Sequence, residues 1–285
     1  MFGITGQALA VTFSFTRRSA LSLMAAVIAW PWGSAMAAEL PGSNQVQIRY
    51  PSSLRPIERH AVILQGATEQ ALSSLSISDS ASLQPYLRLD YKVDSEDVSS
   101  NNKIHPSTGL KLRFMATHHL MLELGGRYEW EHRFIDGSTY QGTSGFFNWS
   151  GYWEIAAPPR ETAHDGPLGY VISSWGQLRY PSAQIDSERS TMLLEGGLQG
   201  DMDWLSLLGE SRLALRGDLE FSTDSAGQDY NNKLIPSLGL VLKMPSGALG
   251  RFEIGARYAL DYRPVTNTVE TGLIGFAGWS VGWKL

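Results

Sequence analysis

Eight charged residues in this sequence could form a surface that binds or selects a ligand. Six of them form three pairs of identical residues that are 130 positions apart: Arg127 with Arg257, Arg133 with Arg263, and Glu123 with Glu253. The other two are Lys111 and Lys243, which lie in the corresponding stretches but not at corresponding positions. Arginine binds carboxylate and phosphate groups through paired hydrogen bonds, so such a surface could select anions or acidic sugars. Acids and bases this close together can also satisfy one another in ion pairs, and the sequence leaves both interpretations open.

No combination of residues in the sequence identifies a catalytic site or a metal site. Lipid hydrolases built on β-barrels place a histidine two residues before a serine on one strand face, and among the six histidines only His105, before Ser107, has that spacing. A single pair with a proline between its members does not identify a hydrolase. One G-x-S-x-G occurs, at Gly278 to Gly282, but it lies inside a predicted strand, whereas a nucleophile elbow needs a turn between a strand and a helix. His118 and His119 are adjacent, so on a strand they would point in opposite directions, and no carboxylate is spaced to join them. We therefore expect no enzyme activity, no cofactor and no metal.

The spacing of 130 extends far beyond the charged residues. The stretch NNKIHPSTGLKL at 101–112 returns as NNKLIPSLGLVL at 231–242, and QIRYPS at 47–52 returns as QLRYPS at 177–182. Matches continue without a gap from Ser43 to the last residue. We therefore expect two tandem copies, at 43–155 and 173–285, joined by a linker at 156–172. Such a long period suggests a fused duplication, because solenoid repeats are much shorter.

Each copy alternates between apolar and polar residues with a period of two. In 122–134 the even positions are apolar or aromatic with one histidine, and the odd positions are glutamate, arginine or glycine. This alternation predicts strands with one apolar face and one charged face. In a membrane-spanning barrel the charged face would point into the lumen.

Six strands are expected in each copy, which makes the protein all-β. The predicted ranges are 43–50, 60–70, 82–94, 107–115, 121–134 and 143–155, and the same numbers plus 130. An even number of strands of this length is typical of a closed antiparallel transmembrane β-barrel, here of about 12 strands. The connections 95–106, 135–142, 225–236 and 264–271 would face outward, and the short turns 116–120 and 245–250 inward.

The N-terminus has the features of a secretory signal peptide. Arg17 and Arg18 precede an apolar run, and Ala35-Met36-Ala37 has the small residues that signal peptidase requires. We expect residues 1–37 to be removed and the barrel to span 38–285. The composition, with 43% hydrophobic residues, no cysteine and a net charge of -5, excludes a disordered chain, a disulfide scaffold and a strongly basic nucleic-acid binder.

The C-terminal segment TGLIGFAGWSVGWKL, at 271–285, resembles the terminal strand of Gram-negative outer-membrane β-barrels. Trp149, Trp153, Trp279 and Trp283 share the outward register, as in an aromatic belt at the membrane interface. The resemblance implies a location in the bacterial outer membrane, with membrane lipid and the outer-membrane assembly machinery as partners. The repeated RY…R and P-S-x-G-L motifs have a weaker similarity to barrels associated with exopolysaccharide export and with phage adsorption.

These observations predict an outer-membrane channel or export component that passes a saccharide or another small anionic solute. One alternative is a closed-lumen receptor or structural barrel that acts through its outer loops at 95–106 and 225–236. Another alternative is an outer-membrane lipid hydrolase. No nucleic-acid partner is expected.

Overall fold

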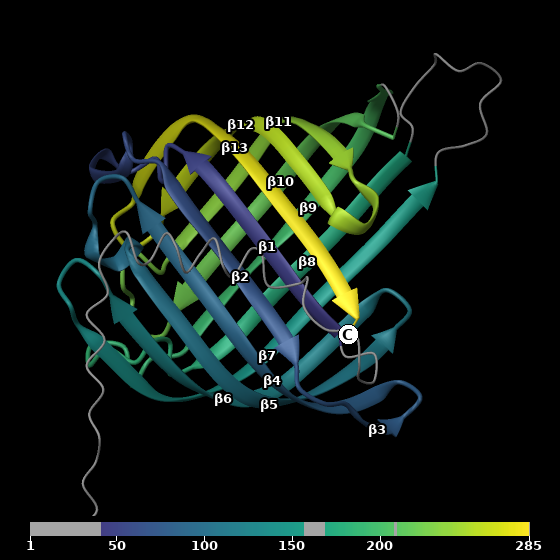
Figure 1. Cartoon of the computed structure of the whole chain (residues 1–285). Helices are drawn as coiled ribbons and strands as arrows, with labels where there is room; N and C mark the ends of the chain where they lie inside the picture. The colour runs from purple at the N-terminus through teal and green to yellow at the C-terminus, as the bar shows by residue number, and fades with distance from the viewer. Residues whose placement is uncertain (1–40, 157–168, 208–209, 285) are drawn as a thin grey trace, which may run out of the picture. The chain divides into compact units, whose positions relative to one another are not determined.

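The computed structural model describes residues 41–156, 169–207 and 210–284. Within these ranges the chain forms strands and three short 3-10 helices (Figure 1). No helix of the described residues is long and apolar enough to cross a membrane. The predicted signal peptide at 1–37 and residues 157–168 of the predicted linker lie outside the described residues.

All twelve predicted strands are present, and a short thirteenth one was not predicted. The strands are β1 (Pro41–Tyr50), β2 (Ile63–Ala71), β3 (Leu75–Ser78), β4 (Ala81–Asp94), β5 (Lys103–Thr117), β6 (Leu120–Arg133), β7 (Thr139–Ala156), β8 (Gly169–Tyr180), β9 (Leu193–Ser206), β10 (Arg212–Asp224), β11 (Lys233–Pro245), β12 (Arg251–Arg263) and β13 (Thr268–Lys284). The 3-10 helices are η2 (Pro56–Glu58), η3 (Ser99–Asn101) and η4 (Gly247–Leu249).

The twelve longer strands form a closed ring. Every pair of neighbours is antiparallel, β1 lies between β2 and β13, and β2 pairs directly with β4. The extra strand β3 pairs with the first residues of β4 and does not take part in the ring. Figure 1 shows the tilted strands that surround the lumen, with β1 beside the last strand, β13. The predicted closed antiparallel barrel is confirmed.

The two faces of the wall have opposite character, as the alternation predicts. On β6, Glu123, Arg127 and Glu129 are buried, whereas Leu124 on the other face is 55% exposed. Exposed leucine and isoleucine side chains continue over the other strands, for example Ile254 and Leu273. An apolar outer wall around a charged interior is the arrangement of a transmembrane β-barrel.

The repeated NNK stretch closes a loop and starts a strand. The Oδ1 of Asp94 accepts hydrogen bonds from the backbone N–H groups of Glu96 and Val98 and from the side chain of Asn102. The same contacts recur 130 positions later around Asp224 and Asn232. Short polar side chains thus replace the backbone partners that a tight loop leaves unpaired.

The strand after each NNK stretch is longer than predicted. We predicted a strand from residue 107, but β5 begins at Lys103, because Lys103 to Pro106 pair with β4. On its other edge β5 pairs with β6 at Ile104 and again at Ser107, but not at the two residues between them. The missing N–H of Pro106 therefore costs no hydrogen bond to β6. Gly109 faces the lumen as expected, since a Cβ on it would meet the Cβ of Arg127 at 2.7 Å.

Candidate functional site in the lumen

The eight predicted site residues all lie on the lumen side of four strands. Strands β5 and β6 carry Lys111, Glu123, Arg127 and Arg133, and strands β11 and β12 carry Lys243, Glu253, Arg257 and Arg263. Each of the eight forms an ion pair with a described residue. The period-two pattern therefore identified their common face, and the ion pairs define what surrounds them.

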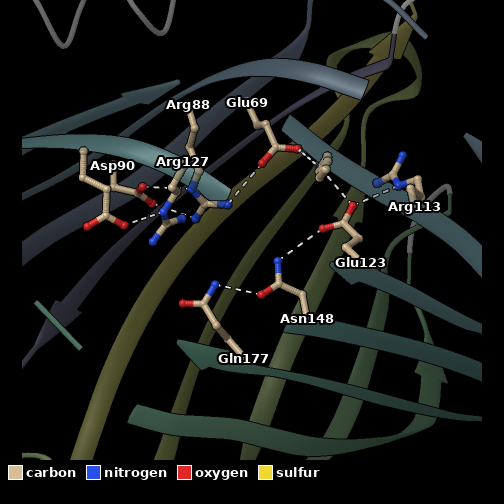
Figure 2. Close-up of polar contacts among 10 residues, drawn as sticks. Glu69, Arg88, Asp90, Arg113, Glu123, Arg127, Asn148 and Gln177 are labelled. Carbon is tan, nitrogen blue, oxygen red and sulfur yellow. Dashed lines mark hydrogen bonds and ion pairs between the residues drawn. The ribbon is translucent and has the colours of Figure 1, made fainter. Parts of the chain in front are cut away.

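Lys111 is the centre of the first cluster. Its ammonium group lies 2.5 Å from a carboxylate oxygen of Glu69 and 2.9 Å from one of Glu123, and the residue is only 3% exposed. Arg113 also donates to Glu123, at 3.0 Å. Figure 2 shows how Asn148 extends this chain of contacts from Glu123 toward the next strand. The cluster joins strands β2, β5, β6 and β7 across the inside of the wall.

Arg127 lies in a neighbouring cluster. Its Nε donates to Glu129 at 2.5 Å, and its guanidinium group lies 5.5 Å from the ring centre of Phe146. Glu129 also accepts from Ser144 at 2.6 Å. Arg88 nearby forms two hydrogen bonds with Asp90, at 2.7 and 2.8 Å (Figure 2). These guanidinium groups already have carboxylate partners within the protein.

The opposite wall holds a second set of ion pairs. Arg216 binds both oxygens of Asp201 at 2.7 and 2.8 Å and also contacts Glu253 at 2.8 Å. Lys243 lies between Asp201, at 2.9 Å, and Asp203, at 2.8 Å. This set also crosses several strands, because its members come from β9, β10, β11 and β12.

The remaining arginines of the site differ in how they are bound. Arg257 contacts Asp218 at 3.1 Å and Glu220 at 2.8 Å. Arg133 binds Glu131 at 2.8 Å, and 130 positions later Arg263 binds Asp261 at 2.9 Å. This last ion pair therefore recurs at a spacing of 130 residues, whereas Val241 and Gln199 stand 130 positions after Lys111 and Glu69.

Sequence reasoning missed three of the acids that complete these clusters. Glu69, Asp201 and Asp203 bind Lys111 and Lys243, but they were not assigned to the lumen face from the sequence. A signal was available, since Asp201 and Asp203 occupy alternate positions of one strand. Tyr86, which could have stacked on a sugar ring, is 1% exposed and packs edge-on against Phe146, so it is part of the wall.

Two loops fold into one end of the lumen. In the loop at 51–62, Leu54 is 3% exposed and packs on the inward-facing residues Ala259 and Ile274. In the loop at 181–192, Gln184 is buried and donates to Glu129 and to the carbonyl of Thr143. Leu54 and Gln184 are 130 positions apart in the sequence. The loop at 51–62 thus contacts an apolar part of the wall through a leucine, and the loop at 181–192 contacts a polar part through a glutamine.

The second of these loops also contacts the loop at 225–232. The hydroxyl of Tyr230 donates to Glu188 at 2.6 Å, and Glu188 accepts a further hydrogen bond from Ser182. Burial, with the adjacent Glu188 carboxylate, raises the pKa of Tyr230 well above its usual range. Tyr230 therefore remains a hydrogen-bond donor at every physiological pH.

A cavity of about 510 Å³ remains inside the barrel between the clusters. Its wall carries glutamine side chains from β1 and β2 together with charged residues from β4, β5 and β12: Gln45, Gln47, Gln65, Arg88, Asp90, Lys92, Lys103, His105, Arg251 and Glu253. The predicted candidate Glu253 lies on this wall. The lumen is therefore polar and is filled only in part.

A closed ring of twelve strands with an apolar outer wall and a charged lumen defines a transmembrane β-barrel. The β domain of the Bordetella autotransporter BrkA has a similar fold, with 13% identity over 87% of this chain and 100% of that one and a TM-score of 0.41. An outer-membrane channel from Pseudomonas putida F1 has 9% identity to this chain, with 88% of this chain and 98% of that one covered and a TM-score of 0.41. The KdgM porin, solved in complex with disordered oligogalacturonate, has 8% identity, with 86% of this chain and 99% of that one covered and a TM-score of 0.36.

No protein-family model matches the chain, and no curated protein matches its sequence. Function therefore has to be argued from the residues of the lumen. Among the described residues, no group of histidine and carboxylate side chains could hold a metal ion. His105 and Ser107 do not form a histidine–serine hydrogen bond of the kind that a hydrolase needs, since the Nε2 of His105 and the Oγ of Ser107 both lack a hydrogen-bond partner in the described part of the chain. The ring of His132 contacts the hydroxyl of Thr139 instead.

Proposed function

We propose that this protein is a passive outer-membrane channel for small anionic solutes, with acidic saccharides as the preferred class. The observation that supports this proposal is the polar cavity of about 510 Å³ inside a closed transmembrane wall. Amide and charged groups on a cavity wall can replace the water that hydrates a polar solute, which is what a selective pore requires.

The proposal includes the cellular route of the chain. Residues 1–37 direct export and are removed, the assembly machinery recognises the segment 271–285, and residues 38–285 enter the bacterial outer membrane. The two copies at 43–155 and 173–285 descend from one duplicated unit. A role in exopolysaccharide export is the more specific form of this proposal.

The channel proposal is tested by single-channel conductance of the refolded mature chain in planar bilayers. We expect steady conductance with a preference for anions. In the double variant Arg127→Ala and Arg257→Ala the preference shifts toward cations, because Glu129, Asp218 and Glu220 lose their guanidinium partners.

A matched control is available in the loops. Arg59 and Arg189 are also 130 positions apart, and both side chains are about half exposed. The double variant Arg59→Ala and Arg189→Ala removes the same charge from exposed loop positions that are not on the strand wall, so its selectivity should equal that of the unchanged protein. Equal selectivity shifts in the two double variants would contradict a filter formed by Arg127 and Arg257.

The second candidate function is a closed-lumen receptor or structural barrel. The observation that favours it is the pair of loops that fold inward through Leu54 and Gln184. A barrel that inserts stably and conducts no ions would support this candidate and reject the channel.

A further inference from the structure

Three lumen cations near the inward-folded loops form no ion pair with any residue that the structure describes. They are Arg49 on β1, Lys92 on β4 and Lys233 at the first position of β11. The Nε of Arg49 is buried and has no hydrogen-bond partner in the described part of the chain. The three residues are partly buried, and a partly buried cation without an ion-pair partner favours the binding of an anion.

These cations lie close enough to influence one another. Lys92 is exposed to the positive charges of Arg49, Lys103 and Lys233 and to one carboxylate, Glu58. Arg49 faces Glu58 and also Glu220, which is held by Arg257 at 2.8 Å. Lys103 is paired with Glu131 at 2.8 Å. Positive charge is therefore in excess around Lys92.

The cavity described above opens beside this group. Lys92, Lys103 and His105 lie on its wall, and the amides of Gln45, Gln47 and Gln65 complete it. The amide of Gln65 donates to that of Gln47 at 3.4 Å, a long contact that leaves both groups able to bind a ligand. Amides both donate and accept hydrogen bonds, as sugar hydroxyls do. A volume of about 510 Å³ is in the range of small-molecule sites.

We propose that this cavity binds a uronic acid, that is, a sugar that carries a carboxylate. The carboxylate binds Lys92 and is attracted by Arg49 and Lys233, and the sugar hydroxyls bind the three glutamines. The inference rests on the proposed function, because it names the ligand class of the same lumen. It deepens that function by assigning the ligand to cations other than the six paired lysines and arginines among the eight candidate residues.

The test is isothermal titration calorimetry on the chain refolded in detergent, with galacturonic acid as the probe. Galactose has the same ring without the carboxylate, and inorganic phosphate has the charge without the ring. We expect galacturonic acid to bind more tightly than both. Lys92→Gln should weaken its binding about tenfold, because one charge-assisted hydrogen bond is lost.

The matched control is Arg113→Gln, which removes one lumen cation that is already paired with Glu123. Binding of galacturonic acid should remain unchanged in this variant. Lys92→Gln is compared with it only after both variants show the heat-modifiable gel mobility of a folded barrel, so that misfolding is not mistaken for lost binding.

The outcomes separate the inference from the proposed function. Binding that Lys92→Gln weakens supports the inference, even in a barrel that conducts no ions and so fails as a channel. Phosphate that binds as tightly as galacturonic acid overturns the sugar assignment. A conducting barrel that does not bind galacturonic acid, or that binds it equally in both variants, overturns the site and leaves the channel proposal intact.

Discussion

Lys111 holds two carboxylates in the lumen wall, and its replacement tests the energetics at the scale of one residue. The variant Lys111→Val leaves Glu69 with Arg88 and Glu123 with Arg113 as their remaining cations. We expect the free energy of unfolding to fall by about 3 kcal/mol, because each of the two carboxylates loses one of its two cation partners and keeps only the more exposed one. Urea unfolding in detergent micelles, followed by tryptophan fluorescence, measures this change.

The protein itself supplies the control for this prediction. The positions that follow Glu69 and Lys111 by 130 are Gln199 and Val241. The double variant Glu69→Gln and Lys111→Val reproduces that natural pair, so it should regain most of the lost stability. A double variant as unstable as the single one would mean that Lys111 stabilises the wall through its contact with Tyr86, 5.1 Å from the ring centre.

The direction of each candidate side chain was predictable, but its partner was not. A period of two fixes which residues of a strand share a face, and this placed all eight candidates in the lumen. The partner of Lys111 is Glu69, which lies 42 residues earlier on a strand that is not its neighbour. That contact depends on the register of three strands, and alternation within one strand carries no information about register.

At the scale of an element, the loop at 51–62 depends on one apolar contact. Leu54 is buried against Ala259 and Ile274, and replacement of a buried leucine by alanine costs about 2–5 kcal/mol. In Leu54→Ala the loop should leave the lumen more often, so trypsin should cut after Arg59 at least about tenfold faster. Limited proteolysis in micelles, with the products identified by mass, measures the rates.

A second leucine gives the control for this loop. Leu249 lies in η4, at the opposite end of the strands, and is 48% exposed. Leu249→Ala removes the same atoms without a buried contact, so cleavage after Arg59 should keep its rate. Fast cleavage in the unchanged protein would show that the loop is not held by Leu54.

The strands were predictable because long amphipathic segments have a strong period, whereas the loops and β3 have none. β3 has only four residues, Leu75–Ser78, and two of them are serine. The inward position of Leu54 depends on a wall some 200 residues further along the chain. A leucine between prolines was the one local signal that this loop has an apolar contact.

At the scale of the whole molecule, the apolar outer wall predicts a strong dependence on lipid. Leu124 is 55% exposed in the middle of β6, and in a water-soluble protein its replacement by arginine would be nearly neutral. In a bilayer we expect Leu124→Arg to lower the free energy of unfolding by about 2–4 kcal/mol. Denaturant unfolding in phosphatidylcholine vesicles measures this loss.

The control for the outer wall lies in a loop. Val265 is 51% exposed between β12 and β13, so it is as accessible as Leu124 but lies beyond the strands. Val265→Arg should leave the stability within about 0.5 kcal/mol of the unchanged protein. Similar small losses in both variants would mean that the wall around Leu124 does not contact the hydrocarbon core.

The pairing of β1 with β13 has a consequence for the timing of synthesis. β1 is translated first of all the strands and β13 last, yet each is the other's neighbour along ten residue pairs. A sheet that formed before β13 was available would have two unpaired edges, which any other extended segment could join. The barrel can therefore close only after the final seventeen-residue strand has been made, and until then the early strands must be kept from pairing with other chains.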